Sequence, residues 1–284
     1  MVLQVKHKQQ QGAALLIVIM ITAIMSIIMT LMLHQSRLDM KLAALVKHRA
    51  LAEVALHNAQ STFIYELMTS PLHLVGPKYV SDTVVFDALV PDFKGTASVN
   101  GAISVSVQDL TGLVSLIPHD EKNFNRLLIE QGYDEEMLLA FNDRYTDWQD
   151  GDSLTHIEGK EKGDYLDYPF FPSNMTVQTV TELAYILEPE VYAAIKPWLA
   201  LYGSGYINRQ FTPEALYSAA GITITNNKEY ASSSDGEGDY IYPSGRFLVK
   251  LSYEDKGVSL HKQFLLMRGH DTFQPFFVAN EKLF

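Results

Sequence analysis

An uninterrupted apolar run near the N-terminus constrains this chain more than any other feature. Residues 13–33 carry no formal charge, no proline and no glycine, and are mostly Leu, Ile, Met and Ala. An α-helix rises about 1.5 Å per residue, so the run would span roughly 30 Å, the thickness of a bilayer's hydrocarbon core. The sequence therefore predicts one membrane-spanning helix.

The residues that flank the run leave three interpretations of it. A secretory signal peptide would have a shorter apolar core and a small-x-small cleavage site, whereas His34 and Arg37 follow here. A simple single-pass anchor explains the length of the run and the preceding Lys6 and Lys8. A prepilin-type leader also explains Gly12, because such a leader is a short basic peptide that ends in glycine and is cut before the apolar helix. The preceding lysines predict a cytoplasmic N-terminus and export of the residues beyond 34.

Composition narrows the class of the exported part. About 250 of the 284 residues lie outside the apolar run, enough for one large or two modest domains. The absence of cysteine excludes disulfides and thiolate metal sites. The net charge of −11 becomes more negative if Lys6 and Lys8 leave with a leader. Such an acidic domain suits divalent cations and basic partner surfaces, and it does not favour nucleic acid.

The helix is predicted to continue well past the membrane. No proline or glycine occurs between Ala13 and Ser70, and Pro71 ends the pattern, so one helix of about 55 residues, roughly 80 Å long, is expected. Its second half has an apolar stripe that should bury against a domain. The stripe comprises Leu38, Leu42, Leu45, Ala52, Leu56, Ala59, Phe63 and Leu67.

Strand patterns lie on both sides of a block with helical periodicity. Alternation over 96–110 around Asn100-Gly101, and over 246–267 around residues 254–257, predicts two hairpins. Further strands are expected at 84–86 and 222–225, and a mobile loop at 231–239. Between the two hairpins, Asp120 and Asp134 are expected to cap helices, and more helix is expected at 181–187 and 189–201. We therefore predict an α+β fold, in which a long N-terminal helix packs on a small antiparallel sheet with a large inserted α-helical domain.

The sequence has no catalytic signature, and we predict that the protein is not an enzyme. It contains no HExxH, no G-x-S-x-G and no glycine-rich phosphate loop. The one dense ionic cluster begins at Asp147, Asp150 and Asp152, and continues through acidic residues to position 167. Calcium takes about six to eight oxygen ligands, often from carboxylates on a flexible loop. The spacing is not that of an EF-hand, and a solvated acidic loop is the alternative interpretation.

With these features assembled, the whole chain resembles the minor pseudopilin K family of bacterial type II secretion systems, also called general secretion pathway protein K. The resemblance rests on the order and spacing of several short motifs. They are Gly12 followed by Ala-Ala-Leu-Leu, the Asp109-Leu-Thr-Gly112 turn, the segment from Leu128 through Asp147-Trp148 to Asp152, Thr181-Glu182-Leu183, Pro189-Glu190-Val191-Tyr192 with Pro197, and Ile207-Asn208. Arg209 to Phe211 depart from the family string that begins at Ile207-Asn208.

The resemblance implies a pilin-like subunit with five parts: a leader (1–12), a transmembrane half-helix (13–33), a helical spine with the first strands (34–117), an inserted helical domain (118–222) and the remaining strands (223–284). It implies cleavage by a prepilin peptidase between Gly12 and Ala13, and N-methylation of Ala13. The mature protein would be a single-pass protein of the inner membrane with a periplasmic C-terminal domain.

The resemblance also implies a place in an assembly. Family members are proposed to cap the tip of a periplasmic pseudopilus together with minor pseudopilins I and J, in contact with other pseudopilins, and to help start its assembly. Most pilin-like subunits carry Glu as the fifth mature residue, where this chain has Ile17. Because an unpaired charge is costly in an apolar filament core, the missing carboxylate would limit which subunit can follow.

Calcium is the cofactor that the resemblance implies for the inserted domain. Carried over to this chain, the expected ligands are Asp147, Asp150, Asp152, Glu161 and Asp164, although residues 159–162 replace a more acidic family stretch. Two other functions remain open from the sequence: a minor pilin of a type IV pilus, and a membrane-anchored periplasmic binding domain.

Overall fold

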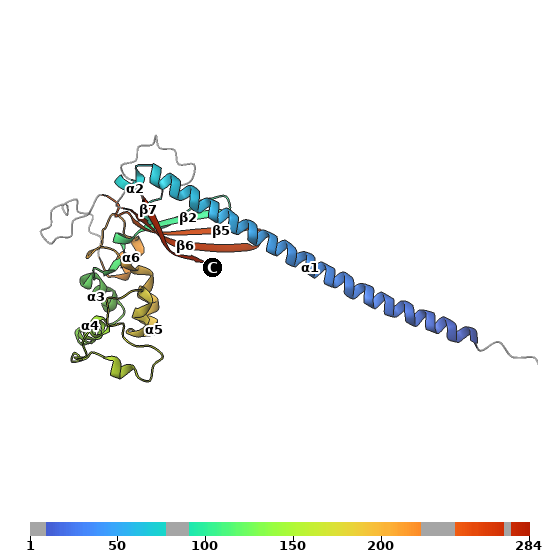
Figure 1. Ribbon diagram of the computed structural model, residues 1–284, viewed down its shortest axis with the longest axis horizontal. Coiled ribbons are helices and arrows are strands. Elements are labelled where there is room, and N and C mark those ends of the chain that lie inside the picture. Colours follow the sequence, from blue (N-terminus) through green and yellow to red (C-terminus); the bar gives the residue numbers. More distant parts are fainter. Residues whose placement is uncertain (1–9, 78–90, 223–241, 270–273) are drawn as a thin grey trace, which may run out of the picture.

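The computed structural model of the protein describes residues 10–77, 91–222, 242–269 and 274–284. The predicted strand at 84–86, the loop at 231–239 and all but the first residue of the strand predicted at 222–225 lie outside these ranges. The described part has an α+β architecture, in which a long helix lies on one face of an antiparallel sheet and a mostly helical segment extends from one end of that sheet (Figure 1).

The first helix is continuous over its whole length. Helix α1 (Gln10–Thr69) has 60 residues and projects far beyond the sheet (Figure 1), and the short α2 (Leu72–Val75) follows Pro71. Helix α1 is long and apolar enough to cross a membrane. The large apolar side chains from Leu15 to Leu33 are 46–69% exposed, as expected of a segment that a bilayer would cover.

A five-stranded antiparallel sheet packs against the C-terminal half of α1. Its strand order is β1-β2-β5-β6-β7. The strands are β1 (Lys94–Asn100), β2 (Ile103–Asp109), β5 (Arg246–Asp255), β6 (Val258–Arg268) and β7 (Phe276–Leu283). Both predicted hairpins are confirmed, and the second turns through Lys256 and Gly257, which both have positive φ as the tight I′ turn requires.

The apolar stripe of α1 is only partly covered by the sheet. From Ala52 onward the prediction holds, because Ala52, Leu56, Phe63 and Leu67 are buried against β5 and β6. Leu38, Leu42 and Leu45 are instead 47%, 61% and 54% exposed, because the sheet contacts only the C-terminal part of the helix. For these three leucines the predicted burial is wrong within the single chain.

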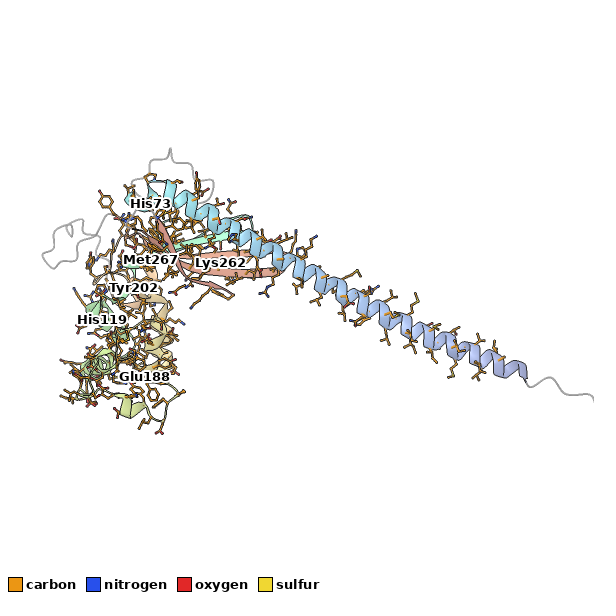
Figure 2. All side chains as sticks on the ribbon, viewed as in Figure 1. His73, His119, Glu188, Tyr202, Lys262 and Met267 are labelled. Carbon is orange, nitrogen blue, oxygen red and sulfur yellow. The ribbon has the colours of Figure 1, made fainter. Side chains whose placement is uncertain are left out.

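The C-terminal strand is tied to both of its neighbours by one carboxylate. Glu281 on β7 pairs with Lys262 Nζ on β6 at 2.8 Å and accepts a hydrogen bond from Gln60 of α1 at 3.2 Å. Figure 2 marks Lys262 on the sheet beside the helix. The hydrogen bond from Lys262 lowers the pKa of Glu281, because it favours the ionised carboxylate.

The inserted segment, defined here as residues 110–222, consists of short elements. They are the 3-10 helices η2 (Leu110–Gly112), η3 (Lys162–Tyr165), η4 (Val180–Tyr185) and η5 (Lys196–Trp198), the α-helices α3 (Glu121–Glu130), α4 (Glu135–Gln149), α5 (Pro189–Ile195) and α6 (Glu214–Ala219), and the parallel strands β3 (Val114–Ile117) and β4 (Leu199–Tyr202). The helix predicted at 189–201 is wrong beyond Ile195, where η5, which contains Pro197, leads into β4.

Asp109 joins the sheet to the inserted segment. Its carboxylate accepts hydrogen bonds from the backbone and hydroxyl of Thr111 (2.9 and 2.7 Å), and from those of Ser244 (2.7 and 2.8 Å). One carboxylate therefore holds together the segment that follows β2 and the segment that precedes β5. Gly112 is required by close packing here, since a Cβ would lie 2.1 Å from the carbonyl oxygen of Phe211. The Asp-x-x-Gly motif thus closes the junction.

Candidate metal centre in the acidic loop

Helix α4 brings the first acidic residues of the centre to its C-terminal end. The Asp134 side chain caps the helix by accepting from Met137 N at 2.9 Å, as predicted. Asp143 and Asp147 are one helical turn apart and share a face. The helix ends at Gln149, and Asp150 has an extended backbone, so Asp150 and Asp152 leave the helix axis and enter the loop.

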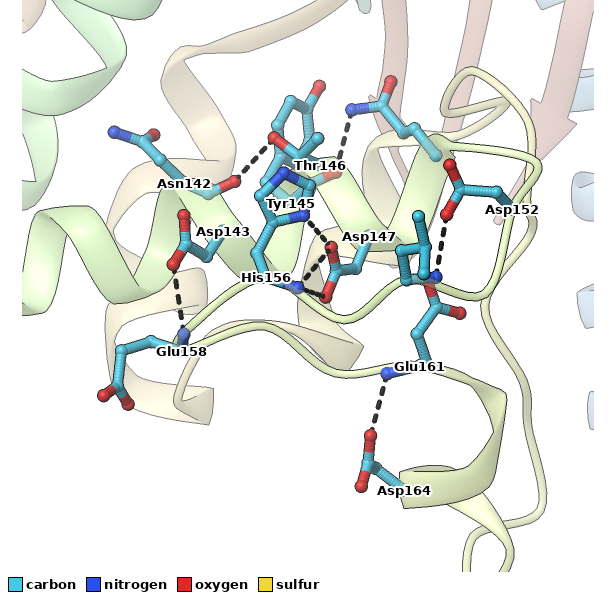
Figure 3. Close-up of polar contacts among 12 residues, drawn as sticks. Asn142, Asp143, Tyr145, Thr146, Asp147, Asp152, His156, Glu158, Glu161 and Asp164 are labelled. Atoms are coloured by element: carbon cyan, nitrogen blue, oxygen red, sulfur yellow. Dashed lines mark hydrogen bonds and ion pairs between the residues drawn. The ribbon is translucent and has the colours of Figure 1, made fainter.

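The loop folds back onto α4 through hydrogen bonds to these carboxylates (Figure 3). The His156 backbone donates to Asp147 Oδ2 at 3.2 Å, and the His156 ring nitrogen Nδ1 also contacts Asp147 Oδ1. The Glu158 backbone donates to Asp143 Oδ2 at 3.0 Å. Gly159 lies so close that a Cβ would be 1.8 Å from Asp147 Oδ2, and only glycine fits there without displacement.

Three carboxylates converge where the loop closes. Asp150, Asp152 and Glu161 each offer an oxygen within 4.8 Å of the others. Among the described residues, Asp150 Oδ1 and Glu161 Oε1 are buried without a hydrogen-bond partner. Burial raises the pKa of Glu161, a hydrogen bond from the Lys162 backbone opposes this, and the charges of the neighbouring aspartates raise the pKa further.

These three residues fit a hard divalent cation. Buried carboxylate oxygens without partners are costly unless an ion or a proton neutralises them. An all-oxygen donor set on a loop is the kind that calcium binds, and the side chains supply part of the number of ligands that calcium takes. The remaining ligands would come from water, backbone carbonyls or second oxygens of the same carboxylates.

The other two predicted ligands have different surroundings. Asp147 is fully buried and belongs to an adjoining group with Asp150 and His156. Asp164 accepts from the backbone of Glu161 at 2.8 Å and thereby caps η3. Neither of the two candidate groups within the described ranges includes Asp164. The structure thus gathers Asp150, Asp152 and Glu161, places Asp147 beside them and gives Asp164 a backbone contact.

His156 is the residue at this site that sequence reasoning missed. Its pKa is raised because Nδ1 hydrogen-bonds to the Asp147 carboxylate, which favours the imidazolium. The nine histidines are scattered through the sequence, and no metal-ligand spacing marks this one. His156 reaches Asp147 because the loop folds back at Gly159, and only the folded structure shows this.

The residues predicted for processing lie at the start of α1. Gly12 and Ala13 fall in its first turn, and Ile17 lies one turn further on, 56% exposed. Cleavage between Gly12 and Ala13 stays a prediction.

Comparison with known proteins points to one family. Residues 106–204, which include the candidate metal centre, match the family described as "Type II secretion system (T2SS), protein K". A search of curated proteins finds no match.

A solved structure shares the fold of this chain. It is "The Crystal Structure of the GspK-GspI-GspJ complex from enterotoxigenic Escherichia coli Type 2 Secretion System". One of its chains matches with a TM-score of 0.58 and 13% identity, covering 84% of this chain and 99% of that chain. At this identity the likeness shows the fold. The family match of residues 106–204 and the shared fold therefore agree with the resemblance that the sequence motifs indicate.

Proposed function

We propose that this chain is a structural, non-enzymatic minor pseudopilin that caps the tip of a periplasmic pseudopilus and helps to start its assembly. The observation that carries the proposal is the position of the inserted segment, which extends from the end of the sheet farthest from the N-terminus of α1 (Figure 1). In a filament of parallel helices, this bulk occupies the space that a subunit added above would need. The chain would therefore end the filament.

Ile17 supports the same position in the filament. At the fifth mature position an Ile offers no carboxylate to the amino terminus of another subunit. Leaving that ammonium group unpaired in an apolar filament core would be costly. A subunit without this carboxylate is tolerated most easily where no further subunit stacks above it.

We propose pseudopilins I and J as the direct partners, by analogy with the complex in which the similar chain was solved. Leu38, Leu42 and Leu45 form an apolar stripe that the sheet leaves exposed. Such a stripe outside the membrane suits packing against the helices of partner subunits.

We also propose a location and a processing step for the N-terminal part of α1. The helix would lie in the inner membrane with its N-terminus cytoplasmic, after a prepilin peptidase has removed residues 1–12 and Ala13 has been methylated.

We propose that Asp150, Asp152 and Glu161 hold a calcium ion in the assembled protein. The bound cation would supply positive charge to three converging carboxylates. The chain's own contribution is to orient them: Asp164 fixes the backbone of Glu161, and Asp147 fixes the loop through His156. The loop would then be held against α4 in one arrangement.

Co-purification with the two partners tests the assembly. The full-length chain, co-expressed with pseudopilins I and J and extracted in detergent, should yield a complex with one copy of each by native mass spectrometry. Leu42→Lys should weaken the complex by placing a charge in the stripe. Met40→Lys is the matched control, because Met40 is equally exposed, at 62%, but lies on the opposite face of the helix. Complexes with several copies of this chain would contradict capping.

A further inference from the structure

A cleft lies beside the candidate metal centre, between α4, the acidic loop and the segment that joins η4 to α5. It has a volume of about 160 Å³. Arg144 and Lys160 contribute the positive charges of its lining, and Tyr165, Tyr168, Phe170 and Tyr185 contribute aromatic rings. Glu188, which also lines it, is labelled near the far end of the inserted segment in Figure 2.

The four rings form a connected aromatic wall. Phe170 stacks on Tyr185 with centroids 4.1 Å apart and contacts Tyr168 at 5.2 Å and Tyr165 at 5.8 Å. Tyr168 and Tyr185 are nevertheless 51% and 46% exposed. Rings held in place by their neighbours and still open to solvent can accept an apolar or aromatic side chain with little loss of entropy.

The two cations of the cleft are only partly neutralised by the residues around them. The Arg144 Nε donates to the Ala140 carbonyl oxygen at 3.1 Å, which fixes the guanidinium on α4. Within the described ranges, neither Arg144 nor Lys160 forms an ion pair with an acidic side chain. The carboxylate that lines the cleft, Glu188, accepts a hydrogen bond from the Tyr133 hydroxyl. This hydrogen bond lowers the pKa of Glu188, and the nearby charge of Arg144 lowers it further, so a docked carboxylate would share Arg144 with Glu188.

We propose that this cleft docks an acidic side chain of a partner protein, an Asp or Glu that is followed by an aromatic or large aliphatic residue. The carboxylate would pair with Arg144 and Lys160, whose charges it complements, and the neighbouring side chain would lie on the aromatic wall. A cationic recess is notable in a chain whose net charge is −11. The proposal goes beyond the tip role, which needs no such recess.

The test compares two peptides that differ in one charge. Acetyl-Gly-Glu-Phe-Gly-amide and its Gln counterpart are titrated into the full-length chain in lipid nanodiscs by isothermal calorimetry. The Trp198→Phe variant leaves Trp148 as the one tryptophan of the chain. Because Trp148 stacks on Tyr185 with centroids 5.8 Å apart, quenching of its fluorescence shows that the peptide binds at the cleft. We expect the Glu peptide to bind with a Kd about tenfold lower than the Gln peptide, with Trp148 fluorescence changing in step.

Matched variants show which cations are responsible. Arg144→Gln and Lys160→Gln should each remove most of the preference for the Glu peptide. Arg126→Gln on α3 and Lys162→Gln in the same loop should preserve it, because these residues do not line the cleft. If Arg144→Gln lowers the melting temperature, its loss of preference could reflect unfolding. Lys160 is exposed, so Lys160→Gln should not affect folding and then shows whether a cation of the cleft is responsible for the preference.

Three results would overturn the proposal. Equal affinity for the two peptides would remove the role of the carboxylate. An unchanged preference in folded Arg144→Gln and Lys160→Gln variants would place the site elsewhere. Sodium acetate binding as tightly as the Glu peptide would make the cleft a site for small anions instead of a docking site. None of these results bears on assembly with pseudopilins I and J.

Discussion

The part of the chain that the structure describes has two hydrophobic cores, which are built by different means. The core between α1 and the sheet uses long regular elements, so that Phe247, Val249 and Leu251 alternate toward Leu56 and its neighbours on the helix. The core of the inserted segment collects residues from short helices, turns and loops, such as Phe124, Val177 and Ile207. The regular spacing of side chains along helix and strand determines which residues enter the first core. The second core depends on side chains that cap its short elements and hydrogen-bond them to one another.

The short elements of the inserted segment are capped and joined by polar side chains. Asp120 and Asp134 cap helices, and Glu182 accepts from the backbones of Gln178 and Thr179 and from the Trp148 indole. The proposed ion would be one more tie of this kind. Apolar truncation should therefore damage the sheet core most, whereas changes in charge, pH or metal should act on the inserted segment.

The largest effect should follow from truncating the sheet core. Phe247→Ala removes a fully buried ring from β5 and should lower the free energy of unfolding by about 3–5 kcal/mol. Phe277→Ala on β7, where the ring is 41% exposed, is the matched control and should cost far less. Urea unfolding of the full-length chain in detergent measures both. Similar losses for the two variants would refute the position of this core.

A methyl group at Gly112, where the sheet joins the inserted segment, should lower the free energy of unfolding nearly as much. In Gly112→Ala the new Cβ would collide with the Phe211 carbonyl oxygen and with Nε2 of Gln108, so we expect a loss of about 3 kcal/mol. Gly163→Ala is the control, because a Cβ there meets no atom within 4 Å. The same unfolding measurement applies, and a fully stable Gly112→Ala variant would show that the close contact is absent.

Removal of the proposed calcium ion should destabilise the inserted segment and leave the sheet core intact. At a hundred times its Kd a bound ion contributes about 2.7 kcal/mol, which a chelator would abolish. Chelation should lower the melting temperature of the native chain and should not affect a double variant with Asp150→Asn and Glu161→Gln. Asp167→Asn is the matched control, since Asp167 belongs to neither candidate group of the described residues. An identical response of the double variant and the native chain would reject these ligands.

The smallest effect is a pH dependence centred on His119. This ring packs on Phe124 and Tyr145, and both of its nitrogens are buried without a partner among the described residues. Burial lowers the pKa of His119, while the charge of Glu121 opposes the shift. The unfolded chain therefore binds a proton at a pH where the folded chain does not.

Stability should consequently fall as the pH drops below the unfolded value of about 6.5, by at most about 1.4 kcal/mol per pH unit, until the lowered pKa of the folded state is passed. The difference in stability between the native chain and His119→Phe, measured from pH ~7 to ~5, isolates this contribution. A difference that does not change with pH would mean that His119 titrates normally in the folded protein.

Regular elements were the part of the fold that the sequence predicted well. Periodicity located α1 and both hairpins, and the caps at Asp120 and Asp134 located α3 and α4. The parallel pair β3–β4 and the short α6 were missed, because a strand of four residues or a helix of six has too little periodicity to detect. Strand β7 has eight residues but was missed because its apolar residues 276–278 are consecutive and do not alternate, and it lies at the edge of the sheet. Their conformation is set by tertiary contacts.

The candidate site was predictable in composition and unpredictable in geometry. Acidic density pointed to residues 147–167, and the family resemblance pointed to five ligands within that stretch, of which the fold brings Asp150, Asp152 and Glu161 together. The use of Asp164 as a cap, the contact of His156 with Asp147 and the close approach of Gly159 all depend on how the loop folds back. Spacing along the chain does not contain that information.

The intact mass of the full-length chain, expressed with and without a prepilin peptidase, tests most directly the claim that this is a pilin-class subunit. With the peptidase we expect the loss of residues 1–12 and the gain of one methyl group on Ala13, and Gly12→Val should block both changes. A mass that stays the same in the presence of an active peptidase would make α1 a simple anchor, and it would contradict the placement of this chain in a pseudopilus.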